Sequence, residues 1–181
     1  MPSERLDKCF RPEPPCLTDG RLPSLSISYH TGDATRPIGV GSKILVHVCN
    51  DIGAWGRGFV VALSRCWPEP EQHYRAWHRG GDSVPFELGQ VQFVPVSESI
   101  VVANLVGQHG IRSSDSSPPV RYEAIRAGLQ RVATHAQSVN ASIHMPRIGC
   151  GLAGGSWGVV ESIVREELAA KGIVVIVYDL P

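Results

Sequence analysis

The chain has 181 residues, of which 43% are hydrophobic and 19% are charged, a composition typical of one soluble globular domain. Seventeen lysines and arginines balance seventeen aspartates and glutamates, so we expect no broad basic surface for nucleic acid. No apolar run approaches the roughly 18 residues of a membrane span, and the five cysteines form no pattern typical of a metal site or a disulfide framework.

Residues 1–23 are polar and proline-rich and have no sustained periodicity. We interpret them as a leader that is disordered or loosely packed on the domain, which is then expected at residues 24–181. The N-terminus lacks the apolar segment of a secretory signal. Scattered cysteines are typical of reduced thiols in the cytosol, so we expect a cytoplasmic monomer.

Strand-like and helix-like segments alternate along the rest of the chain. Alternating or continuous apolar runs predict strands, and apolar positions three and four residues apart predict helices. In chain order we expect strands at 25–30 and 43–49, helices at 58–66 and 69–79, a hairpin of strands at 89–99 and 100–106, a helix at 119–139, a strand at 141–148, a helix at 156–172 and a strand at 173–180. This order predicts an α/β fold, a three-layer α/β/α sandwich around a central mixed sheet.

Two glycine-rich stretches lie where an expected strand ends and a helix begins: CNDIGAWGRGF (49–59) and MPRIGCGLAGGSWG (145–158). Glycine lets backbone N–H groups approach a ligand, and a helix N-terminus adds unpaired donors and partial positive charge. Two such loops would suit a diphosphate, each holding one side. Neither loop has the spacing of a known nucleotide fingerprint, and tight turns alone would also explain the glycines. Trp55 and Trp157 could stack on a base or a ribose, although Trp157 equally fits a helix core.

Four motifs occur in order: TGDAT (31–35), LVHVCNDIGAWGRGF (45–59), LVGQH (105–109) and HMPRIGCGLAGGSW (144–157). Together they resemble the macro domain, a module that binds ADP-ribose. The chain looks most like the branch that includes the macro module of a chromatin remodeller and the terminal ADP-ribose–protein glutamate hydrolase. The resemblance covers roughly residues 25 to 180. It implies ADP-ribose and ADP-ribosylated proteins as partners, and no cofactor.

The resemblance also implies roles for individual residues. Asp33 would accept a hydrogen bond from the adenine amino group, although an aspartate there also commonly caps a turn. Residues 56–58 would form a first phosphate loop, and residues 149–153 a second one over the diphosphate and the distal ribose. The implied ligand-binding residues are Asp33, Ala34, Trp55, Gly56, Arg57, Gly58, Arg147, Ile148, Gly149, Cys150, Gly151, Leu152 and Ala153.

The chain departs from the hydrolase at two positions. The hydrolase has a nucleophilic lysine near the position of Gln108 and an aspartate at the position of Ala153, and this chain has neither. The covalent-lysine route is therefore closed, and any catalysis must use water. The candidates for orienting that water are Asn50, Asp51, Gln108 and His109. A structural role would also explain Asn50, Asp51 and His109.

We interpret the chain as an ADP-ribose-binding protein that hydrolyses ADP-ribose from acidic side chains of proteins. The leaving group of such an ester is a carboxylate, so positioning of water and of the diphosphate is a sufficient mechanism. Two alternatives stay open: a non-catalytic ADP-ribose reader, and processing of small derivatives such as ADP-ribose 1″-phosphate. His47 and His144 lie inside expected strands and are interpreted as core histidines. No base lies near Cys150 in the sequence, so we do not expect its thiol to be a nucleophile.

Overall fold

The computed structural model describes residues 27–111 and 118–181, so the predicted leader at residues 1–23 lies outside the described residues. A six-stranded sheet has the order β1-β6-β5-β2-β4-β3. Its strands are β1 (Ile27–Thr31), β2 (Lys43–Asn50), β3 (Val91–Pro95), β4 (Ile100–Gln108), β5 (Ser142–Pro146) and β6 (Val175–Asp179). Only β3 is antiparallel to its neighbour, β4, so the predicted mixed sheet is confirmed.

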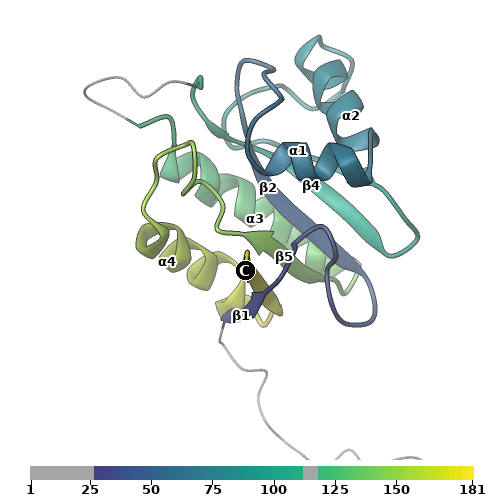
Figure 1. Ribbon diagram of the computed structural model, residues 1–181, viewed down its shortest axis with the longest axis vertical. Coiled ribbons are helices and arrows are strands. Elements are labelled where there is room, and N and C mark those ends of the chain that lie inside the picture. The colour runs from purple at the N-terminus through teal and green to yellow at the C-terminus, as the bar shows by residue number, and fades with distance from the viewer. Residues whose placement is uncertain (1–26, 112–117) are drawn as a thin grey trace, which may run out of the picture.

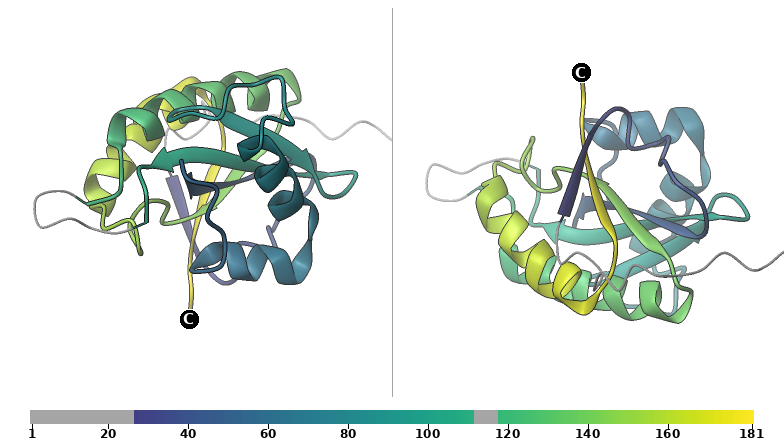
Figure 2. Two further views of the ribbon diagram at one scale, coloured as in Figure 1. Left: turned by 90° about the horizontal axis from the view of Figure 1, so that it is seen from above. Right: turned by 90° about the horizontal axis from the view of Figure 1, so that it is seen from below.

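Helices cover both faces of the sheet (Figure 1). They are α1 (Phe59–Cys66), α2 (Glu69–His78), α3 (Tyr122–Ser138) and α4 (Trp157–Glu167), followed by a short 3-10 helix, η1 (Ala169–Lys171). Figure 2 shows α3 and α4 on one side of the sheet and α1 and α2 on the other. The predicted three-layer α/β/α sandwich is therefore confirmed.

Each helical layer buries the apolar stripe that its sequence predicts. On α3, Ile125, Leu129 and Val132 are fully buried and pack with the sheet and α4 in the larger core cluster. On the opposite face, Tyr74 and Trp77 of α2 are buried against the sheet. Burial of large side chains at these steps holds both helical layers on the sheet.

The predicted helix at 156–172 is interrupted near its end. At Leu168 the backbone leaves regular helical geometry (φ −119°) while the side chain is completely buried. The 3-10 helix η1 follows, and Gly172 stops it in the left-handed conformation (φ 75°), where glycine is favoured. Periodicity alone does not reveal this break, because the buried positions continue through it.

The sheet topology brings the two glycine-rich stretches together. β2 and β5 are parallel neighbours, so their carboxyl ends lie at the same edge of the sheet. The first stretch follows β2 and leads into α1, and the second follows β5 and leads into α4. Ligands of open α/β sheets bind at this edge. Within residues 27–111 and 118–181, no helix is long and apolar enough to cross a membrane.

Candidate functional site

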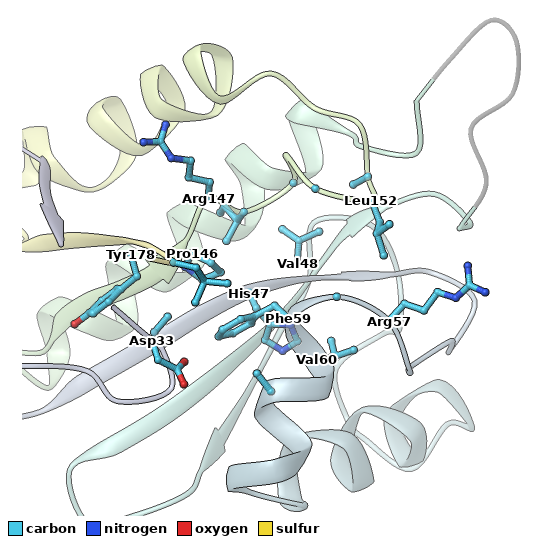
Figure 3. Close-up of a pocket in the computed structure, with 18 of the residues that line it drawn as sticks. Asp33, His47, Val48, Arg57, Phe59, Val60, Pro146, Arg147, Leu152 and Tyr178 are labelled. Atoms are coloured by element: carbon cyan, nitrogen blue, oxygen red, sulfur yellow. The ribbon is translucent and has the colours of Figure 1, made fainter. Parts of the chain in front are cut away.

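A cavity of about 470 Å³ opens at the carboxyl ends of the parallel strands (Figure 3). It extends along the strand order, from the turn after β1 to the end of β4, so it suits an elongated ligand. Its volume lies in the usual range for small-molecule sites. The lining residues are Gly32, Asp33, Ala34, His47, Val48, Arg57, Gly58, Phe59, Val60, Ala62, Gln108, Pro146, Arg147, Ile148, Gly149, Gly151, Leu152, Ala153, Tyr178 and Leu180.

Most of the site residues predicted from the sequence line this cavity. They are Asp33, Ala34, Arg57, Gly58, Gln108, Arg147, Ile148, Gly149, Gly151, Leu152 and Ala153. The others lie beside or behind the lining: Asn50, Asp51, Trp55, Gly56, His109 and Cys150. Four of the six, Asn50, Trp55, Gly56 and Cys150, build or support the two glycine loops. The other two, Asp51 and His109, form a polar pair beyond one end of the cavity.

The first loop (51–58) is held in place by Asn50, the last residue of β2. The buried Asn50 amide accepts hydrogen bonds from the N–H groups of Ile52 (3.1 Å) and Ala54 (2.9 Å) and donates one to the Ala54 carbonyl (2.6 Å). The Tyr74 hydroxyl donates to the Asn50 carbonyl (2.7 Å) and also contacts the Asn50 amide oxygen (3.0 Å). The Asn50 side chain therefore stabilises the loop.

The first loop ends at a helix N-terminus that faces the cavity. Gly56 (φ 146°) and Gly58 (φ 76°) have backbone conformations that other residues rarely adopt. Gly58 is the N-cap of α1 and brings no side-chain cap. The Val61 N–H donates to the Gly58 carbonyl (3.1 Å). The N–H groups of Phe59 and Val60 have no partner among the described residues, and the helix dipole favours an anion there.

The second loop (147–156) is closed by its own backbone. Gly155 N–H donates to the Gly149 carbonyl (2.9 Å), and Gly154 N–H donates to the Gly151 carbonyl (3.0 Å). At Gly151, a Cβ would meet no atom within 4 Å, so this position faces open space in the cavity. The two loops approach each other where a Cβ on Gly58 would lie 3.6 Å from Leu152 Cδ1.

The Cys150 thiol is turned into the second loop. Its Sγ contacts the Ile148 carbonyl at 3.2 Å, and partial burial raises the pKa of the thiol despite the opposing effect of Arg147. A neutral thiol is a poor nucleophile. Cys150 is therefore suited to supplying loop backbone, in line with the interpretation of the sequence.

Asp33 lies at the β1 end of the cavity (Figure 3). Its Oδ1 accepts the Thr35 N–H (2.9 Å), as in a capped turn, which leaves Oδ2 for a donor on a ligand. Tyr178 lines the same end, and its hydroxyl accepts the Ile38 N–H (3.0 Å) and contacts His144 Nδ1 (2.9 Å). This end thus combines a carboxylate with an aromatic wall.

Sequence reasoning missed His47 as a lining residue. Its side chain is buried, as predicted, yet it also borders the cavity beneath Phe59 (Figure 3). Nε2 lies 2.6 Å from Asn104 Oδ1, and the Asn104 amide nitrogen donates to the Pro70 carbonyl (3.0 Å). That second bond fixes the Asn104 amide orientation, so His47 Nε2 is the protonated nitrogen. Burial lowers the pKa of His47 to about 4, so the imidazole is neutral at pH 7.

The two tryptophans of the glycine-rich stretches do not line the cavity. Trp55 packs between His47 (ring centroids 5.5 Å apart) and Tyr74 (5.3 Å), and its Nε1 donates to Ser64 Oγ (2.8 Å). Trp157 donates to the Tyr29 hydroxyl (3.1 Å) and lies under Arg147 (5.3 Å). Trp55 therefore supports the first loop from behind, and Trp157 packs at the start of α4.

Arg147 borders the cavity, but its guanidinium is already paired. Nε and Nη2 donate to the two carboxylate oxygens of Asp179 at 2.6 and 2.7 Å. These hydrogen bonds lower the pKa of Asp179. The pair is exposed, so its contribution to stability is small, and its main effect is to orient the Arg147 side chain.

Asp51 and His109 meet beyond the cavity end at β4. Asp51 Oδ2 lies 2.6 Å from His109 Nδ1, and Asp51 Oδ1 accepts the Gly110 N–H (2.8 Å). Partial burial raises the pKa of Asp51, but the hydrogen bonds from Gly110 and His109 outweigh it, so the pKa is lowered overall. No group of three or more His, Cys, Asp or Glu side chains able to hold a metal ion occurs in the described part of the chain.

Two solved structures are similar to the chain over nearly their whole length. The macrodomain protein from Streptomyces coelicolor is 53% identical, with a TM-score of 0.76, over 85% of this chain and 99% of that one. A protein of unknown function from Bacteroides thetaiotaomicron is 52% identical, with a TM-score of 0.83, over 87% of this chain and 99% of that one. No protein-family model matches the chain.

Curated relatives of three kinds align with most of the chain. The mouse chromodomain-helicase-DNA-binding protein 1-like is 32% identical over 88% of this chain, which spans only 18% of that relative's length. The DNA ADP-ribosyl glycohydrolase of Thermus aquaticus is 26% identical over 76% of the chain and 37% of its own length. The ADP-ribose 1″-phosphate phosphatase of Candida albicans is 28% identical over 77% of the chain and 92% of its own length.

Proposed function

The chain belongs to the macrodomain family, and from that premise we propose that it binds ADP-ribose and hydrolyses ADP-ribose from acidic side chains of modified proteins. One observation carries the proposal: two glycine loops, one of them leading into an uncapped helix N-terminus, meet across an elongated cavity. Such a set of backbone donors suits a pyrophosphate. The names of two relatives, a glycohydrolase and a phosphatase, also refer to ADP-ribose.

The cavity accommodates the parts of ADP-ribose in one order. Adenine lies near Asp33, whose free carboxylate oxygen accepts the amino group, with Tyr178 beside it. The diphosphate lies between Gly58 and the second loop. The distal ribose then reaches the end at Gln108, because the lining follows the strand order from β1 to β4.

Hydrolysis in this site uses water. No lysine occurs in the β4 strand or directly after it, and the residue after Gly151-Leu152 is a buried alanine, Ala153. An ester between the distal ribose and a glutamate or aspartate releases a carboxylate, which needs no acid to leave. The two loops immobilise the diphosphate, so the anomeric carbon is held where a positioned water can attack.

Assays with three substrates test this proposal. We expect release of ADP-ribose from glutamate-linked ADP-ribosylated protein above the rate without enzyme, measured by mass spectrometry. The same enzyme is given ADP-ribose 1″-phosphate and an ADP-ribosylated DNA oligonucleotide, because relatives are named for these activities. Tight ADP-ribose binding with no release from any substrate would instead identify a reader. Release only from the phosphate or only from DNA would replace the proposed substrate.

Asp33 variants test the adenine end of the site. Replacement of Asp33 with alanine should weaken ADP-ribose binding by about 1–3 kcal/mol, the usual effect of losing a hydrogen bond to a charged group. Asp33→Asn keeps an acceptor for the Thr35 N–H but turns a donor toward the adenine amino group, so it should weaken binding at least as much. Calorimetry with ADP-ribose measures both. Wild-type affinity in the asparagine variant would remove Asp33 from the site.

A further inference from the structure

We propose that Asp51 and His109 form a general-base pair that activates the hydrolytic water, an assignment that rests on the proposed hydrolase function. His109 would be the catalytic residue, and Asp51 would position its imidazole. The two residues are 58 positions apart in the chain and follow different strands, β2 and β4. The structure brings them together just beyond the end of the cavity that Gln108 lines.

The backbone fixes the geometry of the pair. Asp51 N–H donates to the Gln108 carbonyl (3.0 Å), which ties the residue after β2 to the last residue of β4. The two Asp51 carboxylate oxygens then bind different partners, Gly110 N–H at 2.8 Å and His109 Nδ1 at 2.6 Å. A carboxylate held at both oxygens has one orientation, so the direction of the imidazole is set as well.

The pair borders the end of the cavity that would hold the distal ribose. Gln108, which precedes His109, lines the cavity, and its amide nitrogen donates to the Gly110 carbonyl (2.8 Å). His109 N–H donates to the Pro119 carbonyl (2.8 Å). The next residue, Val120, donates to the carbonyl of Ala153 in the second loop (3.1 Å). His109 is thus connected on both sides to residues that line or build the cavity.

The negative charge of Asp51 suits His109 to act as a base. An ionised Asp51 carboxylate accepts a hydrogen bond from the protonated Nδ1 of His109, so the lone pair of the imidazole is on Nε2. The lowered pKa of Asp51 keeps its carboxylate charged at neutral pH. The His109 side chain is 64% exposed, and no described residue hydrogen-bonds to its Nε2. Nε2 can therefore reach a water molecule, and Asp51 stabilises the imidazolium once it forms.

His47, the histidine that lines the cavity, cannot take this role. His47 Nε2 donates to Asn104, and burial lowers the pKa of His47 to about 4. A base of this strength, enclosed in the sheet, accepts a proton poorly at neutral pH. His109 differs from His47 in two ways. Its partner, Asp51, is ionised, and its side chain is exposed to solvent.

In the proposed reaction, water attacks the sugar carbon and His109 accepts the proton of that water. His109 Nε2 takes a proton from water while the water oxygen attacks the anomeric carbon of the distal ribose. The bond from that carbon to the ester oxygen breaks, and its electron pair leaves on the glutamate carboxylate. The products are ADP-ribose with a free anomeric hydroxyl, the unmodified carboxylate, and a proton on His109 that returns to solvent.

The test compares His109→Ala and Asp51→Asn with matched controls. His73→Ala removes an exposed histidine of α2, and Glu98→Gln removes a charge from the exposed β3–β4 turn. We expect His109→Ala to lower kcat for glutamate-linked substrate by about 10²- to 10⁴-fold, with ADP-ribose affinity unchanged within about twofold. Added imidazole should restore part of the rate. Both controls should keep the wild-type rate and melting temperature.

Asp51→Asn reports on positioning. An asparagine can still accept the Gly110 N–H, but its amide then donates to His109 Nδ1 and moves the imidazole proton to Nε2. The variant should lose rate as His109→Ala does, and imidazole should not restore it. In H₂¹⁸O, the released glutamate carboxylate should gain no heavy oxygen, because water attacks the sugar carbon.

Three outcomes would overturn the pair. They are a wild-type rate in His109→Ala, a rate loss that appears entirely as weaker ADP-ribose binding, and heavy oxygen in the carboxylate. Absence of hydrolysis by the wild-type protein is a different failure, since it removes the proposed hydrolase function itself. The two failures are distinguished by measuring wild type and variants in the same assay.

Discussion

Replacement of Gly151 with glutamate should abolish ADP-ribose binding, with a loss of at least about 100-fold in affinity, which corresponds to about 2.7 kcal/mol. A Cβ at this position meets no atom within 4 Å, so the side chain enters the cavity without a clash in the protein. There its carboxylate occupies the space of the diphosphate and repels it. Calorimetry with ADP-ribose measures the loss, and the melting temperature should stay near the wild-type value.

An uncharged variant, Gly151→Gln, distinguishes the steric effect of the new side chain from the effect of its charge. Gly151→Gln adds a side chain of the same size, so it should also weaken binding, but by less than glutamate and with little dependence on salt. The glutamate variant should regain some affinity at high salt, because salt screens the repulsion between exposed charges. Full affinity in a folded Gly151→Glu protein would mean that the second loop does not hold the diphosphate.

The helices and strands could be predicted because their signals are local. The apolar steps of α3 and the continuous apolar run of β2 depend only on neighbouring residues. The ends of the predicted elements are less accurate where tertiary packing determines where a strand or helix stops. The predicted strand ends at Val106, before Gly107, whereas β4 continues to Gln108. Position 107 lies against Ile125 and Val48, where a Cβ would come within 3.0 and 3.2 Å, so glycine there serves close packing.

The site could be predicted in part for the same reason. Glycine loops between a strand and a helix are visible in the sequence, and both line the cavity as expected. His47 and Tyr178 were missed because each lies in a buried strand, where periodicity indicates only core. Their part in the site depends on which strand ends are neighbours, and the order β1-β6-β5-β2-β4-β3 is a property of the whole fold.

The contact between Asp51 and His109 also could not be predicted from the sequence. Each residue was identified from the sequence as a candidate for orienting water, but neither could be linked to the other. Their contact requires β2 and β4 to be adjacent with Asn50 opposite Gln108. For Trp55 the sequence left open whether the ring stacks on a base or a ribose. In the structure Tyr74 and His47 pack around it behind the loop.

Gly155→Ala should disrupt the second loop and with it both stability and binding. A Cβ on Gly155 would lie 2.5 Å from the Gly149 carbonyl oxygen, which is the acceptor of the Gly155 N–H bond that closes the loop. The clash is with backbone, so no side-chain rotation relieves it. We expect a loss of about 1–3 kcal/mol in the free energy of unfolding and at least about tenfold weaker ADP-ribose binding, measured by chemical denaturation and calorimetry.

Gly158→Ala is the matched control for this effect. Position 158 lies in the first turn of α4, and a Cβ there meets only Ser156 Oγ at 4.0 Å. Alanine is favoured over glycine in a helix by up to about 1 kcal/mol, so this variant should be as stable as wild type or slightly more stable, with unchanged affinity. Equal ADP-ribose affinity in Gly155→Ala and Gly158→Ala would contradict this prediction. It would mean that binding of the diphosphate does not depend on the closed conformation of the second loop.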